Sequence, residues 1–147
     1  MPDRARLSAL CVMSLVLSLG GSLAAENWPG WRGPRGDGTS QEANIPQHWN
    51  GETGENIAWK VPIPGAGHAS PIVWEDRIFL ATCLPDDQAR VLMCLDRDSG
   101  KTVWQQKVLE CPLETKHNLN SFASSTPATD GSQVVVAFLE VDGSTVP

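Results

Sequence analysis

Residues 96–107 contain the spacing in this chain that comes nearest to a metal-binding loop. Asp96, Asp98 and Gly100 reproduce the first half of an acidic calcium loop, in which alternate carboxylates bind the ion and a glycine makes the sharp turn. Such a loop needs a glutamate at its twelfth position, where this chain has Lys107. We therefore expect no metal site here. We interpret Asp96 and Gly100 as turn residues, the first accepting hydrogen bonds from backbone amides and the second supplying a left-handed position.

The cysteines supply thiols but show no pattern typical of a metal or redox site. Cys83, Cys94 and Cys111 form no Cys-x-x-Cys, no adjacent pair and no Cys/His spacing suited to zinc. Cys94 lies in an apolar stretch and is predicted to be a small core residue. The odd count leaves at least one of the three cysteines unpaired in an oxidising compartment, and their pairing stays open.

Two loop regions carry polar residues with more than one reading. His68 follows Gly65-Ala66-Gly67, which lacks the strand, third glycine and helix of a dinucleotide site. This histidine could face a central channel and contact a ligand, or be an ordinary loop residue. His117, Asn118 and Asn120 could meet a partner or simply be solvated.

The tripeptide Arg35-Gly36-Asp37 matches an adhesion motif, but its neighbours Pro34 and Gly38 favour an ordinary turn. We assign no catalytic residue and leave the cofactor-binding residues unknown.

The elements that hold these residues are predicted to be short strands. Helical patterns are nearly absent, and turn residues separate four apolar segments at residues 70–74, 77–83, 90–96 and 102–108. The segments Ile78–Ala81 and Val91–Leu95 are apolar throughout, so both faces of their sheet must be covered. Because the chain has no sequence for covering helices, we expect stacked antiparallel sheets.

The N-terminus has the pattern of a secretory signal peptide. Arg4 and Arg6 precede the apolar run Leu7–Leu19, which is too short to span a bilayer, and small residues follow. We expect residues 1–25 to be removed and the protein to be periplasmic or secreted, with no transmembrane span. Residues 26–147 then carry 9 basic and 16 acidic side chains, a net charge of 9 − 16 = −7. Such a surface disfavours nucleic acid as a partner.

Two stretches of the chain recur, at offsets that differ by 11 residues. Trp59 and Trp104 are 45 residues apart in similar surroundings, and "ASPIVWEDRIFLA" returns 56 residues later as "STPATDGSQVVVAF". In this alignment the turn Glu75-Asp76 corresponds to Asp130-Gly131. A repeat of about 40–50 residues with four strands is typical of propeller blades. Trp104, and by analogy Trp59, is then expected on an outer strand, where its ring fills the gap between splayed sheets.

The stretch Cys94–Trp104, "CLDRDSGKTVW", resembles the repeat of the PQQ-like (quinoprotein) β-propeller family, Ala-x-Asp-x-x-Thr-Gly-x-x-x-Trp. Cys94 takes the alanine position and Ser99 the threonine position. The segment "NWPGWRGPRGDGTS" is similar to the leader of exported members of this family. The resemblance covers most of residues 27–146 and implies an all-β fold of four-stranded antiparallel blades. It assigns structural repeat roles to Asp96, Gly100, Trp104 and Trp59.

This resemblance sets the expected domain organisation. Residues 26–56 form an irregular Trp/Gly/Pro-rich segment, and residues 57–147 form a partial propeller, with a first full blade at about 70–108 and a second begun at about 123–147. Since a closed propeller needs about four to eight blades, we expect the sequence to be an N-terminal fragment of an exported protein. The large rings Trp28, Trp31 and Trp49 are expected to dock on a preformed surface.

Two functions are consistent with the resemblance. The first is a noncatalytic module that binds a protein partner or serves as a scaffold, similar to the outer-membrane assembly lipoproteins that share the repeat. The alternative is the N-terminal part of a PQQ-dependent alcohol or sugar dehydrogenase, with PQQ and calcium bound only in the full-length protein. The first is preferred because the recognisable residues are structural.

Overall fold

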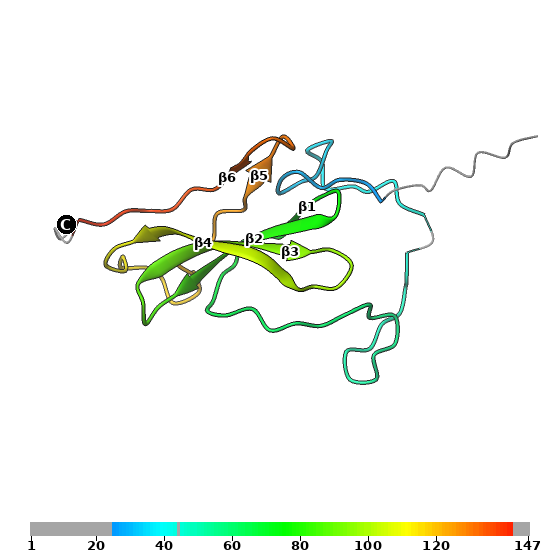
Figure 1. Cartoon of the computed structure of the whole chain (residues 1–147), viewed down its shortest axis with the longest axis horizontal. Helices are drawn as coiled ribbons and strands as arrows, with labels where there is room; N and C mark the ends of the chain where they lie inside the picture. Colours follow the sequence, from blue (N-terminus) through cyan, green and yellow to red (C-terminus); the bar gives the residue numbers. More distant parts are fainter. Residues whose placement is uncertain (1–24, 44, 143–147) are drawn as a thin grey trace, which may run out of the picture.

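The computed structural model describes residues 25–43 and 45–142, which contain strands and turns but no helix (Figure 1). Its strands are β1 (Ile72–Trp74), β2 (Arg77–Leu84), β3 (Ala89–Asp96), β4 (Thr102–Glu110), β5 (Ala128–Thr129) and β6 (Val134–Val135). Strands β1 to β4 form one antiparallel sheet in that order, and β5 and β6 form a separate hairpin. The expected all-β class and four-stranded meander are confirmed.

Both faces of the sheet are packed at β2 and β3, as their uniformly apolar sequences predicted, whereas β4 is exposed along nearly its whole length. Alternation along the strands sends neighbouring side chains to opposite faces. Face A carries Ile72, Phe79, Leu92 and Cys94, and Val134 and Val136 pack against it. Face B carries Ala89, Val91, Met93 and Leu95, and Val61 packs against it. The core is therefore two layers of side chains on either side of one sheet, covered by segments from different parts of the chain.

The β5–β6 hairpin repeats the pairing of β1 with β2 at an offset of 56 residues. The pairs Ile72 with Phe79 and Val73 with Ile78 become Ala128 with Val135 and Thr129 with Val134. The repeat proposed from sequence is therefore matched in strand register over these two pairs. The hairpin lies over one side of the sheet (Figure 1).

The turn alignment made from the sequence differs from the structure by one residue. The residues with positive φ are Glu75 (51°) and Gly131 (91°), which are 56 apart, so Glu75-Asp76 corresponds to Gly131-Ser132. The two-residue turn between β1 and β2 becomes a four-residue loop in the second hairpin. The reason is Asp130, whose Oδ1 accepts hydrogen bonds from the amides of Ser132 and Gln133 at 2.9 Å each. These hydrogen bonds take the place of those that a further pair of strand residues would make between their backbones.

The segment around Trp59, expected to be an outer strand, belongs to no strand in the structure. It has no neighbouring strand to pair with among the described residues, and Pro62 and Pro64 lack amide donors. The chain is anchored instead at the isolated bridge between Ala66 and Cys83. Before this bridge, residues 57–65 follow face B of the sheet without pairing with it (Figure 1).

The N-terminal segment from Ala25 to Asn56 contains turns and isolated bridges, with no strand among its described residues. Trp28 exchanges both backbone hydrogen bonds with Val73 of β1, at 2.7 and 3.0 Å. The neighbouring Pro29 carbonyl accepts from Thr129 of β5 at 2.9 Å. This segment, here called the leader, therefore ties β1 of the sheet to β5 of the hairpin. Trp31 and Trp49 do not dock as expected; they are 65% and 68% exposed.

The expected signal peptide at residues 1–25 falls almost wholly outside the described residues. Within residues 25–43 and 45–142 there is no helix of the length and hydropathy that a membrane span requires.

Candidate functional site

The turn between β3 and β4 is closed by Asp96. Its backbone N–H donates to the Lys101 carbonyl and its carbonyl accepts from the Gly100 N–H, both at 2.8 Å. Its Oδ1 accepts from the Ser99 amide at 2.9 Å and from the Ser99 hydroxyl at 2.6 Å. These hydrogen bonds from Ser99, with a smaller contribution from the positive charge of Arg77, hold the pKa of Asp96 below its ordinary value. Gly100 has φ of 70°, the left-handed position that a turn of this kind requires.

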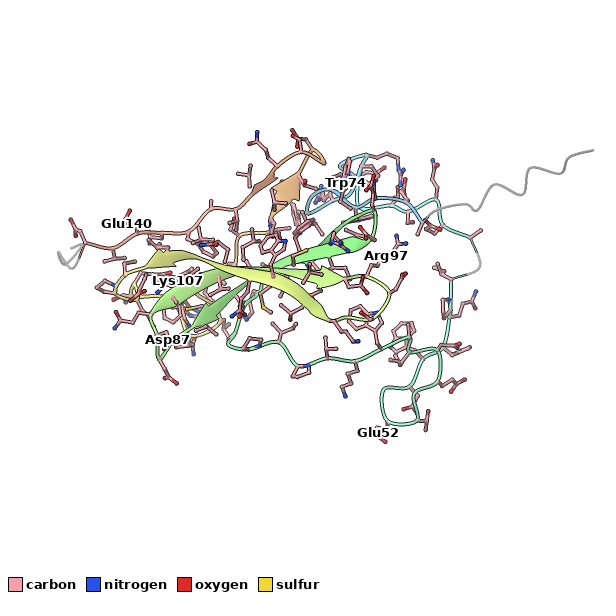
Figure 2. All side chains as sticks on the ribbon, in the orientation of Figure 1. Glu52, Trp74, Asp87, Arg97, Lys107 and Glu140 are labelled. Atoms are coloured by element: carbon pink, nitrogen blue, oxygen red, sulfur yellow. The ribbon has the colours of Figure 1, made fainter. Side chains whose placement is uncertain are left out.

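Trp59 covers this turn from a segment 37 or more residues earlier in the chain. Its indole Nε1–H donates to the Arg97 carbonyl at 2.8 Å, between Asp96 and Ser99. A Cβ on Gly100 would lie 2.5 Å from Trp59 Cε3, so the ring rests directly on the glycine. The contact therefore needs both a glycine for close approach and an unpaired carbonyl for the indole N–H. Arg97 marks this end of the sheet in Figure 2.

Trp104 lies on β4, an edge strand of the sheet, and is 39% exposed. Its ring centroid is 6.0 Å from that of Phe79 on face A. The two rings line a groove of about 390 Å³ between the sheet and the β5–β6 hairpin. Trp74 and Arg77 also line it from the sheet, and Gly131 and Gln133 are among the residues that line it from the hairpin. Figure 2 shows Trp74 where the sheet, the leader and the hairpin meet.

The residues that suggested calcium chemistry are engaged in other contacts. Asp96 Oδ1 is taken by Ser99, and Asp96 Oδ2 lies 3.7 Å from Arg77 Nη1. Asp98 is 3.8 Å from the Arg97 Nε, with most of its side chain in solvent. Across the described ranges, no group of three or more His, Cys, Asp or Glu side chains is arranged to hold a metal ion.

His68 lies in an exposed loop that meets the second polar loop, a contact that the sequence did not predict. Its backbone N–H donates to the Ala123 carbonyl and to the Ser121 hydroxyl, each at 3.0 Å. Asn120 Oδ1 accepts from the Ser121 amide at 2.9 Å and from the Ser124 hydroxyl at 2.6 Å. The structure therefore brings the two loops together through backbone and hydroxyl groups.

In the same polar loop, His117 accepts a hydrogen bond from the Leu119 amide at its Nδ1, at 3.2 Å. The Leu119 side chain beside it is exposed. The loop is therefore shaped in part by its own side chains.

Arg90 is the functional-looking residue that sequence reasoning missed. It is fully buried, and its guanidinium donates to the Cys111 carbonyl at 2.8 Å and pairs with Glu114. Its Nη1 also lies 3.5 Å from the Cys111 thiol, while its Nε has no hydrogen-bond partner. A single arginine in the apolar stretch "ARVLMC" gives no indication of burial, because arginine is usually exposed. Arg90 is the cross-strand partner of Cys83 on β2, and this position places it on face A of the sheet.

The three described cysteines are all free thiols. Cys94 is buried on face A, as expected for a small core residue, and burial raises its pKa. Cys83 is buried as well; burial raises its pKa, and the nearby Arg90 charge opposes that rise. Cys111 is partly exposed and beside Arg90.

Arg35 and Asp37 of the adhesion-like tripeptide serve the leader itself. Arg35 pairs with Glu26 and donates to the Thr39 carbonyl. Asp37 Oδ1 accepts hydrogen bonds from the Thr39 amide and hydroxyl at 2.8 Å each. The hydrogen bond from the amide N–H is the main reason why the pKa of Asp37 is lowered.

A second, wider hollow lies at the end of the sheet opposite Arg97 and is lined in part by Asp86, Asp87, Lys107 and Glu110. Asp87 and Lys107 mark this end in Figure 2. Lys107 forms a hydrogen-bonded ion pair with Glu110, and this interaction raises the pKa of Lys107.

Comparison with known proteins adds no relative: no family model, no curated protein and no solved structure matches the chain.

Proposed function

We propose that the chain is part of an exported β-propeller of the PQQ-like repeat type and acts as a noncatalytic scaffold that binds a protein partner. The observation that carries this proposal is the head-to-tail packing of successive repeat units. The counterparts of Ile78 and Leu80 at an offset of 56 residues are Val134 and Val136. Ile78 and Leu80 pack with face B, and Val134 and Val136 pack on face A. The hairpin therefore contacts the sheet through its own equivalent of face B.

The same relation holds on the other side of the sheet. Trp59 and Val61 are the counterparts of Trp104 and Gln106 on β4 at an offset of 45 residues. Val61 packs on face B and Trp59 covers the β3–β4 turn. A face that always meets the opposite face of its neighbour is a heterologous contact, and repetition of such contacts closes into a ring when the rotation allows it.

The two units touch where each of them begins, as blades that converge on an axis would. Ser70 and Thr126, which are 56 residues apart, touch through a 3.1 Å hydrogen bond from the Ser70 amide to the Thr126 hydroxyl. This contact between the starts of the two units supports the radial arrangement.

The leader supplies the surface that we propose for the partner. Trp31, Ile45 and Trp49 are large apolar side chains that are each about two thirds exposed. Exposed aromatic residues are typical anchors of protein interfaces. The leader is also tied to both β1 and β5, so a partner bound there would be held by two repeat units.

The test introduces a photoreactive amino acid at Trp31 or Trp49 in the cells that produce the protein. A discrete adduct with one partner is expected at these positions and not at Glu52, an exposed polar residue of the same leader (Figure 2). Crosslinking no stronger than at Glu52 would count against the scaffold. The purified protein is also titrated with PQQ and calcium. The appearance of quinone absorbance, with dye reduction on adding an alcohol, would support the dehydrogenase instead.

A further inference from the structure

Glu26, the residue that follows the expected signal peptide, is bound by the loop after it. Its carboxylate forms an ion pair with Arg35, whose Nη2 lies 3.0 Å from Glu26 Oε2 and also donates to the Thr39 carbonyl. The hydrogen bond from Arg35 is the main reason why the pKa of Glu26 lies below its ordinary value, so this carboxylate is ionised at neutral pH. The side chain of Glu26 is therefore fixed against residues 35–39.

The backbone nitrogen of Glu26 has a carboxylate partner of its own. Its N–H donates to Oε1 of Glu42. Among the described residues Glu42 makes no ion pair with a basic side chain. Arg32, which with Arg35 makes up the basic residues of segment 26–42, lies over the Trp31 ring at 4.6 Å. Because a carboxylate binds a charged donor more strongly than a neutral amide, this position suits a positive charge on the Glu26 nitrogen.

Removal of residues 1–25 would create that charge. Hydrolysis of the peptide bond between Ala25 and Glu26 consumes one water, leaves a carboxylate on Ala25 and gives Glu26 an amine that is protonated at neutral pH. The small residues permit cleavage after Ala24 or after Ala25. Cleavage after Ala25 places the amine on the nitrogen that already meets Glu42.

We propose that the mature chain begins at Glu26 and that its α-ammonium forms an ion pair with Glu42, closing residues 26–42 into a loop. This inference rests on the proposed export and adds control by processing to the leader.

Closure of this loop would act on the part of the leader that crosses the sheet (Figure 1). Asn27 Oδ1 accepts from the Glu75 amide at 2.6 Å, and Trp28 exchanges backbone hydrogen bonds with Val73. Trp31, one of the proposed partner anchors, lies within the loop itself. Processing would therefore complete the surface that the leader presents.

The first test is the intact mass and N-terminal sequence of the protein recovered from the cells that export it. The expected first residue is Glu26. A chain that begins at any other residue overturns the proposal, because the Glu26 nitrogen is then a neutral amide or absent. Retention of residues 1–25 would also count against export itself, whereas a start at a neighbouring residue leaves export intact.

The second test compares two purified chains, one beginning at Glu26 and the other at Ala24, which carries the amine two residues away. Hydrogen exchange is followed at Gly36 and Gly38, whose amides donate to carbonyls within the loop. These amides should exchange about two- to five-fold more slowly in the chain that begins at Glu26, the size expected for an ion pair at a surface. The difference should shrink in 1 M salt.

Two variants separate the ion pair from a general effect of charge. Glu42→Gln keeps an acceptor for the Glu26 nitrogen but removes the charge, so the two starts should then exchange equally. Glu52→Gln removes a charge elsewhere in the same leader and should leave the difference in place. Equal exchange in the two parent chains, or a difference that persists in Glu42→Gln, would overturn the ion pair. Neither result bears on crosslinking at Trp31 or Trp49, so failure here is distinguishable from failure of the scaffold proposal.

Discussion

At the scale of single residues, one kind of contact occurs three times. In each case a tryptophan ring lies on a glycine that the backbone holds at positive φ. An added Cβ would come within 2.5 to 2.8 Å of the ring carbons in the pairs Gly33 with Trp28, Gly100 with Trp59, and Gly131 with Trp74. Each contact excludes water from a turn without using an aliphatic side chain. Three of the six tryptophans therefore cover backbone, which explains how a chain with few core residues holds its turns.

Replacing Gly100 with alanine should be more destabilising than replacing Gly36. Both glycines have φ of 70°, but a Cβ at Gly36 would meet nothing within 4 Å, while one at Gly100 would collide with Trp59. Gly36→Ala should lower the free energy of unfolding by about 1 kcal/mol through left-handed strain. Gly100→Ala should lower it by about 1 to 3 kcal/mol more through overpacking. Urea unfolding measures both, and equal losses would contradict the proposed ring contact.

Asp96 should make stability fall in acid. Because its folded pKa lies below its ordinary value, the ionised carboxylate contributes stability above the unfolded pKa of about 3.9. That contribution is lost as the pH falls through the folded pKa. Asp96→Asn keeps an acceptor for Ser99 but has no charge to lose, so its deficit against the parent should be largest near neutral pH and shrink below about pH 4.

Urea midpoints at a series of pH values test this, with Asp98→Asn as the control for removing one charge from the same turn. The series extends to pH 2, about two units below the ordinary aspartate pKa. If the stability deficit of Asp96→Asn stays constant down to that pH, the ionisation of Asp96 is not linked to stability.

Elements were predictable where a local pattern decides them. The apolar runs bounded by Glu75-Asp76 and by Asp96–Gly100 gave the four strands closely, because strand length and turn chemistry are local properties. The segment at Trp59 was misassigned as a strand, since pairing depends on a neighbour that sequence pattern does not supply. Arg90 was missed for a related reason: its burial depends on Glu114 and on carbonyls from the loop after β4.

Arg90 is expected to hold the loop at residues 111–122 against the sheet. Arg90→Met removes the one charged partner that Glu114 has among the described residues, and it leaves the Cys111 carbonyl without this donor. Breaking a buried pair in this way costs about 3 kcal/mol. Glu114→Gln keeps an acceptor beside the guanidinium and should cost less.

Hydrogen exchange should show the amides of residues 111–122 exchanging faster in Arg90→Met, with a smaller effect in Glu114→Gln. Unchanged exchange in this loop would mean that the arginine stabilises only the sheet.

At the scale of the whole molecule, the chain is held together by units that pack front to back and by a leader that crosses from one to the next. The sheet contacts the hairpin through Val134 and Val136 on face A, and it contacts the segment of Trp59 and Val61 on face B and at the β3–β4 turn. Trp28 and Pro29 then join β1 to β5 by backbone hydrogen bonds. In the repeat architecture proposed above, each added unit would present the same two faces to its neighbours.

Two adjacent valines test whether the hairpin is stabilised by this stacking. Val136 packs against clusters on face A, whereas its neighbour Val135 is 64% exposed. Val136→Ala should lower the free energy of unfolding by about 1 kcal/mol, from the methyl groups no longer buried, and Val135→Ala should change it little.

Combined with Phe79→Ala on the sheet, only Val136→Ala should show a coupling energy, since the effects of residues that share a packed cluster are not additive. Additive effects for Val136 and Phe79 would mean that the hairpin and the sheet fold as neighbours without depending on each other, and the front-to-back stacking of units would then have no energetic basis.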